Sequence, residues 1–207
     1  MTAISSGDVV TAYKRYAPVY DFLFGKVLEQ GRKRIADEVC RLTPGTLLEV
    51  GVGTGLLLSR YPADAEIVGV DVSREMLDRA REAASILRNH KITLHEMDGE
   101  HLGFEDGSFD LVTVPYVLSV TPDPARFMDE LRRVCKPNGY ILVANHFSGQ
   151  RGWRVLEAIT RSVADRIGFR SEFNFDQHVP HPDWTIEKVE EVNMLGLSRL
   201  VVIRNGK

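Results

Sequence analysis

The sequence predicts an α/β fold: one domain built on a mostly parallel sheet of seven strands, with helices on both faces. Short apolar segments alternate with amphipathic segments of about 10–15 residues, which is the pattern of repeated βαβ units. Three glycines follow the first apolar segment and open the next amphipathic one. The chain has 207 residues, of which 43% are hydrophobic and 27% charged, as expected of a globular domain with its own core.

The N-terminal segment, residues 1–42, is predicted to form a helical cap on the main domain, which spans residues 43–207. Residues 8–41 place tyrosine, valine and alanine at helical spacing, and Pro18 interrupts this pattern. A second helix is expected over residues 26–42, because the Thr-Pro-Gly sequence that follows is a helix stop signal.

The alternating pattern then continues to residue 144. Five strands are expected, at residues 46–50, 66–72, 91–97, 109–116 and 140–144. Helices are expected at residues 73–88, where Ser73 can cap the N-terminus, and at residues 123–135. The segment 56–61 has the composition of a further helix start. The fourth strand is almost entirely apolar, which is typical of a strand buried on both faces.

The alternation ends after residue 144. Residues 148–183 contain a helical stretch and a polar loop, and we interpret them as an insertion after the fifth strand. Residues 186–193 and 198–204 are predicted to close the sheet as two more strands, joined by a turn at Gly196.

Composition excludes several classes of protein. The net charge of −3, from 26 basic and 29 acidic residues, argues against a dedicated nucleic-acid binder, so no nucleic-acid partner is expected. Cys40 and Cys135, both in segments predicted to be helical, are interpreted as buried thiols in a reducing compartment. His178 and His181 lie in a loop without nearby cysteines, so no metal site is expected. No apolar run reaches the ~18–20 residues of a membrane span, and the N-terminus lacks a signal-peptide pattern, so we expect a cytoplasmic protein.

The strongest functional pattern is the glycine turn after the first strand, together with Asp71. Gly51, Gly53 and Gly55 lie where a ligand can approach the backbone, and Asp71 ends the next strand, where a carboxylate can accept two ribose hydroxyls. The spacing G-x-G-x-G differs from the dinucleotide pattern, and Glu49 would repel a pyrophosphate. S-adenosyl-L-methionine (SAM) fits better, because it has a ribose for Asp71 and a cationic ammonium and sulfonium for Glu49.

Four motifs in order extend this interpretation: E-V-G-V-G-T-G from Glu49, G-V-D-V-S from Gly69, M-D-G-E from Met97 and F-D-L-V from Phe109. The chain thereby resembles the class I SAM-dependent methyltransferases over residues 44–145. The resemblance implies a Rossmann-like fold and a SAM cofactor that leaves as S-adenosyl-L-homocysteine. The cofactor-binding residues that it implies are Glu49, Gly51, Gly53, Gly55, Asp71, Val72, Met76, Asp98, Gly99 and Pro115.

The same resemblance assigns parts of the cofactor to these residues. The glycine turn would hold the methionine portion, with Glu49 near the sulfonium, and Asp71 would bind the ribose. Pro115 and Tyr116 would lie beside the transferable methyl group.

The adenine end is assigned in the same way. Val72 and Met76 would line the ring, and Asp98 would accept a hydrogen bond from its amino group, with Gly99 and Glu100 shaping the rim. Two alternatives stay open here: Met76 as an ordinary core residue of its helix, and Glu100 as a solvated surface charge.

Two basic, amphipathic segments bear on the acceptor of the methyl group. Residues 1–36 carry six basic and three acidic residues among aromatic ones, and residues 150–170 repeat apolar residues and arginines at helical spacing. Both segments could lie on an anionic membrane surface. The contacts would be Lys14, Arg15, Arg151, Trp153 and Arg154. Alternatively, each segment is a helix that packs on the domain and leaves a solvated basic face.

Candidate catalytic residues lie near the N-terminus and after the last parallel strands. Asn145 and His146 follow the fifth strand, whose end faces the ligand crevice of an open α/β sheet. His146 is a candidate general base or orienting residue, and Asn145 could bind a polar acceptor group. Tyr16 and Tyr20 could close over SAM, hold a cationic amine by cation–π contact, or pair with His146, and Tyr116 is a further candidate catalytic residue.

Two further stretches resemble the small bacterial phospholipid N-methyltransferases: Y-A-P-V-Y-D-x-x-F-G at Tyr16–Gly25 and Y-V-L-S-V-x-P-D-P at Tyr116–Pro124. This resemblance implies stepwise methylation of phosphatidylethanolamine to phosphatidylcholine. We therefore expect a phospholipid substrate, an anionic membrane surface as partner, and a monomer held peripherally at the inner face of the cell membrane.

Other functions share much of this pattern. A methyltransferase that acts on a quinone or a soluble small molecule would have the same SAM motifs but would not bind anionic vesicles. A non-catalytic module that binds SAM or membranes would bind SAM without turnover. A nicotinamide-dependent oxidoreductase is disfavoured by the glycine spacing and by Glu49.

Overall fold

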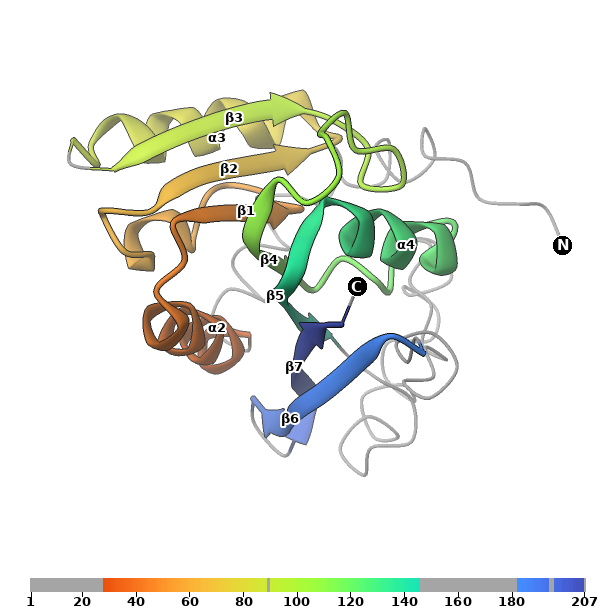
Figure 1. The fold of residues 1–207 in the computed structure, drawn as a ribbon. Helices are drawn as coiled ribbons and strands as arrows, with labels where there is room; N and C mark the ends of the chain where they lie inside the picture. The colour runs from red at the N-terminus through yellow and green to blue at the C-terminus, as the bar shows by residue number, and fades with distance from the viewer. Residues whose placement is uncertain (1–27, 89, 146–181, 194–195, 207) are drawn as a thin grey trace, which may run out of the picture.

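The computed structural model describes residues 28–88, 90–145, 182–193 and 196–206. They form a mostly parallel sheet of seven strands, as predicted, and the strand order is β3-β2-β1-β4-β5-β7-β6 (Figure 1). The elements are α2 (Glu29–Leu42), β1 (Thr46–Val50), η1 (Leu58–Arg60), β2 (Glu66–Asp71), α3 (Arg74–Ser85), β3 (Lys91–Glu96), β4 (Phe109–Pro115), α4 (Pro124–Val134), β5 (Cys135–Asn145), β6 (Trp184–Val192) and β7 (Ser198–Asn205).

The strand order reverses between β1 and β4. The chain builds outward from β1 through β2 to β3, then crosses over to β4, and all neighbouring pairs from β3 to β5 are parallel. Strand β7 inserts antiparallel between β5 and β6. The reversal leaves a crevice at the carboxyl ends of β1 and β4, which is where open α/β sheets bind ligands.

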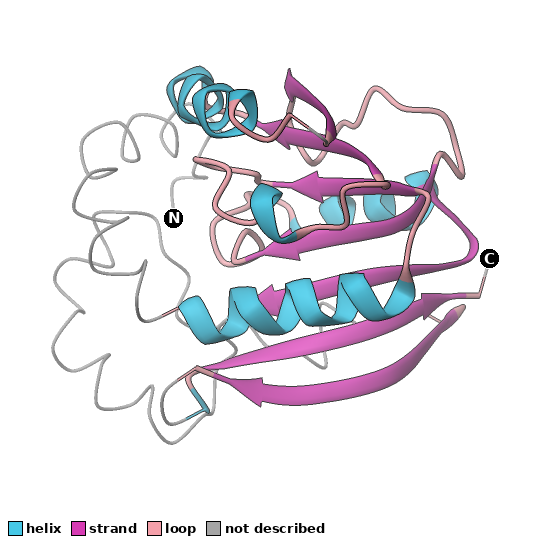
Figure 2. Ribbon diagram, turned by 90° about the vertical axis from the view of Figure 1, so that its left-hand side faces the viewer, coloured by secondary structure: helices cyan, strands magenta, loops and turns pink. Residues whose placement is uncertain are grey.

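Two apolar cores sandwich the sheet because the central strands are buried on both sides. In β1, Leu47 belongs to the core under α2 and α3, whereas Leu48 belongs to the core under α4. Figure 2 shows α2 lying in front of the sheet and α4 behind it. In that view the N-terminal end of α2 lies at the edge where the parallel strands end.

Local signals set the ends of the helices. The side chain of Ser73 accepts a hydrogen bond from the Met76 amide and caps α3, as predicted. Asp123 caps α4 in the same way, with Pro124 at the first helical position. Thr43 ends α2 in the left-handed conformation.

Three predictions about local structure are corrected. The stretch predicted as a helix start at 56–61 forms only the 3₁₀ turn η1. Cys135 begins β5 and is not helical, because α4 ends at Val134 and Cys135 pairs with Phe109. Cys40 is exposed on α2, so only Cys135 is the buried thiol that was expected.

No helix in the described part of the chain is long and apolar enough to cross a membrane. Most of the predicted N-terminal cap and the insertion at 148–183 lie outside the described residues. The same holds for several candidate residues: Lys14, Arg15, Tyr16, Tyr20, His146, Arg151, Trp153 and Arg154.

Candidate active site

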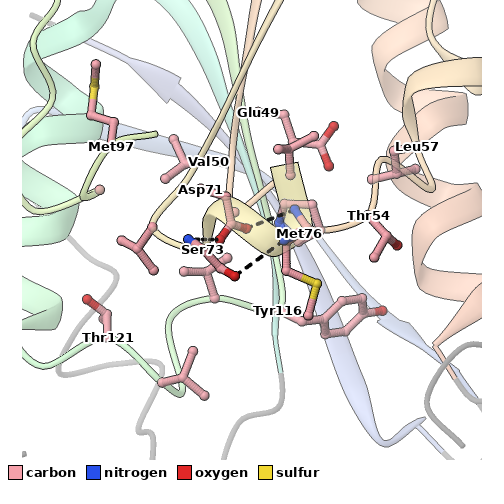
Figure 3. Close-up of a pocket in the computed structure, with 18 of the residues that line it drawn as sticks. Glu49, Val50, Thr54, Leu57, Asp71, Ser73, Met76, Met97, Tyr116 and Thr121 are labelled. Carbon is pink, nitrogen blue, oxygen red and sulfur yellow. Dashed lines mark hydrogen bonds between the residues drawn. The ribbon is translucent and has the colours of Figure 1, made fainter. Parts of the chain in front are cut away.

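A pocket opens at the carboxyl ends of β1, β2 and β4, in the crevice that the strand order predicts. Most of the predicted cofactor-binding residues line it: Glu49, Gly51, Gly53, Asp71, Val72, Met76, Asp98, Gly99 and Pro115. Figure 3 shows Glu49, Thr54 and Leu57 on one side of the pocket, Asp71 near its centre, and Met97 on the far side.

The glycine turn exposes backbone to this pocket. Gly51 and Gly53 have φ values of 78° and 54°, which glycine adopts without strain. A side chain at Gly51 would lie 2.2 Å from Val117, whereas one at Gly53 would meet nothing within 4 Å. Gly53 thus borders open space, where a ligand can approach its backbone.

Gly55 has a different task from the one predicted. It does not line the pocket, and a side chain there would lie 3.2 Å from the backbone of Ala80 on α3. Its φ of 79° also favours glycine. Gly55 therefore lets the turn pack closely against α3, and its contribution to the cofactor site is indirect.

Asp71 links the glycine turn to the start of α3 by hydrogen bonds. Its two carboxylate oxygens accept hydrogen bonds from the amides of Gly53 and Ser73, each at 2.9 Å (Figure 3). Burial raises the pKa of this carboxyl above its usual value, and the backbone amides oppose that effect. Because a carboxylate has about four acceptor positions, Asp71 can still accept hydroxyl groups from a ligand.

Glu49 is a buried acid on the pocket wall. Its side chain is 2% exposed, and its Oε2 atom has no hydrogen-bond partner among the described residues. Burial raises the pKa of Glu49 to about 8, although a hydrogen bond with Tyr61 opposes the rise. Tyr61 in turn lies 3.3 Å from the Thr113 hydroxyl. A cationic group in the pocket would satisfy Glu49 and favour its charged form.

The residues predicted for the adenine end also line this pocket. Val72 and Met76 line the pocket together, so Met76 is not only a core residue of α3. Asp98 holds the turn after β3, because its Oδ1 accepts the Glu100 amide at 2.9 Å.

Glu100 is buried and does not form a solvated charge. Its Oε1 atom accepts hydrogen bonds of 2.7 Å from the Thr121 hydroxyl and from the Asp123 amide. Thr121 and Pro122 line the pocket, so Glu100 fixes one wall without touching the interior.

Tyr116 lies on the pocket wall in a constrained conformation. Its φ is 64°, in the left-handed region that non-glycine residues avoid. Its hydroxyl accepts a hydrogen bond of 2.9 Å from Asn193, whose Oδ1 accepts the Gly31 amide at 2.8 Å. The Asn193 amide also donates to Ser198 at 2.9 Å. The start of α2 and the turn after β6 therefore fix the position of the Tyr116 ring.

This contact gives a test of packing. A methyl group at Gly31 would lie 1.8 Å from the Tyr116 hydroxyl oxygen. We expect Gly31→Ala to lower the free energy of unfolding by about 1–3 kcal/mol, although alanine normally favours a helix. Denaturant unfolding measures this change, with Gln30→Ala on the exposed face of α2 as the control. Equal or greater stability of Gly31→Ala would contradict the contact.

Asn145 does not match its predicted place at the acceptor. It is fully buried at the end of β5, where it is paired with Arg199 of β7, and it does not line the pocket. Its neighbour His146 lies outside the described residues, and its catalytic role stays a prediction.

Several residues of this region carry no signal in the sequence, among them Leu28, Arg32, Tyr61 and Asn193. Leu28 and Arg32 of the N-terminal helix line the pocket, Tyr61 supports Glu49 and Asn193 supports Tyr116. All of them reach the site through contacts between distant parts of the chain. A periodic pattern along the sequence carries no signal for such contacts.

A family model described as a methyltransferase domain matches residues 48–143. The phosphatidylethanolamine N-methyltransferase of Cereibacter sphaeroides is 38% identical over 190 residues, which cover 90% of this chain and 91% of that protein. The chain belongs to the SAM-dependent methyltransferase family. A 2-phytyl-1,4-naphtoquinone methyltransferase from Trichormus variabilis is also similar to this methyltransferase, at 31% identity over 82% of the chain and 81% of the relative.

Solved structures agree with the fold. A SAM-dependent methyltransferase from Aquifex aeolicus superposes with a TM-score of 0.61, at 18% identity, over 95% of this chain and 97% of that one. At this level of identity the likeness shows the Rossmann-like methyltransferase fold alone.

SAM is the cofactor of this family, and the pocket of this methyltransferase fits it. Glu49 lines this pocket and its buried Oε2 atom has no hydrogen-bond partner among the described residues, so a cationic group in the pocket would complement it. Asp71 has acceptor capacity for ribose hydroxyls, and Val72 and Met76 give an apolar wall for the adenine. These pocket residues therefore complement a ligand that has a cationic end, a ribose and a flat ring.

Proposed function

We propose that this methyltransferase methylates the amine of phosphatidylethanolamine stepwise, through the mono- and dimethyl forms, to phosphatidylcholine. The observation that carries the proposal is the 38% identity, over nine tenths of the chain, to a protein named for the first of these activities. The motif Tyr116–Pro124 supports it from within the described residues, because it forms the pocket wall and the cap of α4.

The chain's own residues would act mainly by positioning. SAM supplies an electrophilic methyl group, so the protein must place the amine in line with that group and exclude competing nucleophiles. Pro115 ends β4, Tyr116 follows it, and both line the pocket, where they would lie beside the incoming acceptor. The Tyr116 ring, held by Asn193, offers an aromatic face to an amine that gains charge as methyl groups are added.

The amine must lose a proton before it attacks. Its solution pKa lies far above neutrality, so a base or a desolvating pocket is needed. We propose His146 for this task, because it follows the last residue of β5, and β5 runs parallel to β4 with Ala144 beside Pro115. Tyr16 and Tyr20 are proposed to complete the aromatic surface around the amine.

The same proposal places the protein on an anionic membrane surface at the inner face of the cell membrane, as a monomer. The basic residues of the N-terminal segment and of residues 150–170 would supply the electrostatic attraction. Binding of this kind weakens as salt screens the charges.

A quinone is the competing acceptor, because a naphthoquinone methyltransferase also matches four fifths of the chain. The two are separated by supplying labelled SAM with either phosphatidylethanolamine vesicles or a demethylated naphthoquinone in detergent. We expect methyl transfer to the vesicle lipid only. Transfer to the quinone, with none to the lipid, would overturn the proposal and leave SAM-dependent methyl transfer intact.

A further inference from the structure

Asn193 joins three parts of the fold through one side chain. It follows β6, is 5% exposed, and does not line the pocket. Its Oδ1 atom accepts the Gly31 amide at 2.8 Å, in the first turn of α2, where backbone amides have no partner inside the helix. Its side-chain amide donates to the hydroxyls of Tyr116 and Ser198, each at 2.9 Å. Asn193 therefore links α2, β7 and the pocket wall.

The hydroxyl of Tyr116 lies in a closely fitting socket. The socket exists because Gly31 has no side chain: a Cβ atom there would lie 1.8 Å from the hydroxyl oxygen and 3.2 Å from the Asn193 Oδ1 atom. Figure 3 shows this hydroxyl pointing away from Asp71. At its other end, Tyr116 donates its backbone amide to the Ala144 carbonyl at 2.7 Å. Tyr116 is thus held at both ends, and its left-handed backbone, with φ at 64°, is kept in place.

A fixed aromatic ring matters most for the last of three methyl transfers to an amine. In each transfer the nitrogen lone pair forms a bond to the methyl carbon while the bond from that carbon to sulfur breaks, so the positive charge passes from sulfur to nitrogen. After the first two transfers the nitrogen carries N–H groups that can donate hydrogen bonds, and it gives one proton to water before the next transfer. After the third it has no N–H group. An aromatic face then remains to stabilise the charge.

We propose that Asn193 is a positioning residue that lets methylation run to the quaternary product. It holds the Tyr116 ring, through the hydroxyl, against the nitrogen that becomes permanently charged. The inference rests on the proposed function, because it needs an amine acceptor beside Tyr116. Asn193 itself contacts neither the acceptor nor the cofactor.

The test compares the first and the last transfer in separate assays. Initial rates at saturating SAM would be measured on vesicles of phosphatidylethanolamine and on vesicles of its dimethyl form, with Asn193→Gly, Tyr116→Phe and the double variant. Glycine suits position 193 because the φ of Asn193 is 66°. We expect Asn193→Gly to lower the rate on the dimethyl lipid about 3- to 30-fold more than the rate on phosphatidylethanolamine.

Tyr116→Phe should shift this ratio in the same way, because it keeps the ring and removes the hydroxyl. The double variant should shift it no further, since both substitutions break the same hydrogen bond. The ratio of the two rates does not depend on how much of the protein is folded. A loss of stability alone would therefore leave it unchanged.

Asn205→Ala is the matched control. Asn205 is a fully buried asparagine whose side-chain amide donates to the carbonyls of Cys135 and Arg132, at 3.0 and 3.2 Å, and it does not line the pocket. Its loss should lower stability and leave the ratio of rates as in the unmodified chain.

Equal losses on the two lipids in Asn193→Gly would overturn the role of Asn193, and so would a further shift in the double variant. If Asn193→Gly does not fold, Tyr116→Phe and Gly31→Ala act on the same hydroxyl from the ring and from the helix. Both must then shift the ratio, and an unchanged ratio in either would overturn the proposal. If the unmodified chain methylates neither lipid, the proposed function fails and this inference fails with it.

Discussion

Replacing Asp71 by alanine is expected to lower the affinity for SAM by about 30- to 150-fold, which corresponds to about 2–3 kcal/mol. On the predicted assignment of the ribose to Asp71, the substitution would leave two ribose hydroxyls of the bound cofactor without an acceptor. It also removes the acceptor of the Gly53 amide, so the glycine turn loses its link to α3. Calorimetric titration with S-adenosyl-L-homocysteine measures the loss.

Asp78→Ala is the control for this substitution. Asp78 is an exposed acid on α3 that pairs with Arg81 at 2.6 Å and does not touch the pocket. The Asp78→Ala variant should bind S-adenosyl-L-homocysteine with the same affinity as the unmodified chain. If Asp71→Ala kept full affinity, the assignment of the ribose to Asp71 would be wrong.

Glu49→Gln is expected to weaken SAM binding and to stabilise the unliganded protein at the same time. The folded pKa of about 8 lies above the ordinary value of 4.5, so the folded chain holds a proton on Glu49 that the unfolded chain releases. The contribution of Glu49 to the free energy of unfolding is fully present below about pH 4.5 and is lost as the pH rises toward 8. Because glutamine does not titrate, Glu49→Gln avoids this loss. We expect its free energy of unfolding to exceed that of the unmodified chain by on the order of 1–2 kcal/mol at pH 8, with no difference at pH 4.

The affinity for SAM should change with pH in the direction opposite to the change in stability. A cationic ammonium pairs with the charged form of Glu49, so SAM binding below pH 8 must release a proton, and the apparent affinity should rise with pH up to about 8. Calorimetry in two buffers of different ionisation enthalpy counts the released protons. Glu49→Gln should release none and bind at least tenfold more weakly, whereas Glu66→Gln, at the exposed start of β2, serves as control. Unchanged proton release in Glu49→Gln would place the titrating group elsewhere.

The parts of the structure that follow local rules were predictable from the sequence. The apolar strands around β1, the cap at Ser73 and the stop at Thr43 each depend on a few neighbouring residues. The placement of Glu49 and Asp71 in one pocket also followed, because the ends of adjacent parallel strands meet at one edge.

The parts that depend on distant contacts were not predictable. Gly55 looks like its neighbouring glycines in sequence, and only the approach of Ala80 gives it a packing role. Asn145 seemed free to bind an acceptor, but pairing with β7 buries it. Arg32 seemed part of a basic surface, yet the packing of α2 on the sheet brings it to the pocket.

The central claim, methylation of a membrane lipid amine, is tested most directly by a labelling time course. The full chain would be incubated with methyl-labelled SAM and vesicles of phosphatidylethanolamine and an anionic phospholipid, and the lipids would be separated by thin-layer chromatography. The account predicts label first in the monomethyl lipid, then in the dimethyl lipid, and finally in phosphatidylcholine. Unlabelled lipid, in a sample whose SAM binding is intact by calorimetry, would contradict it.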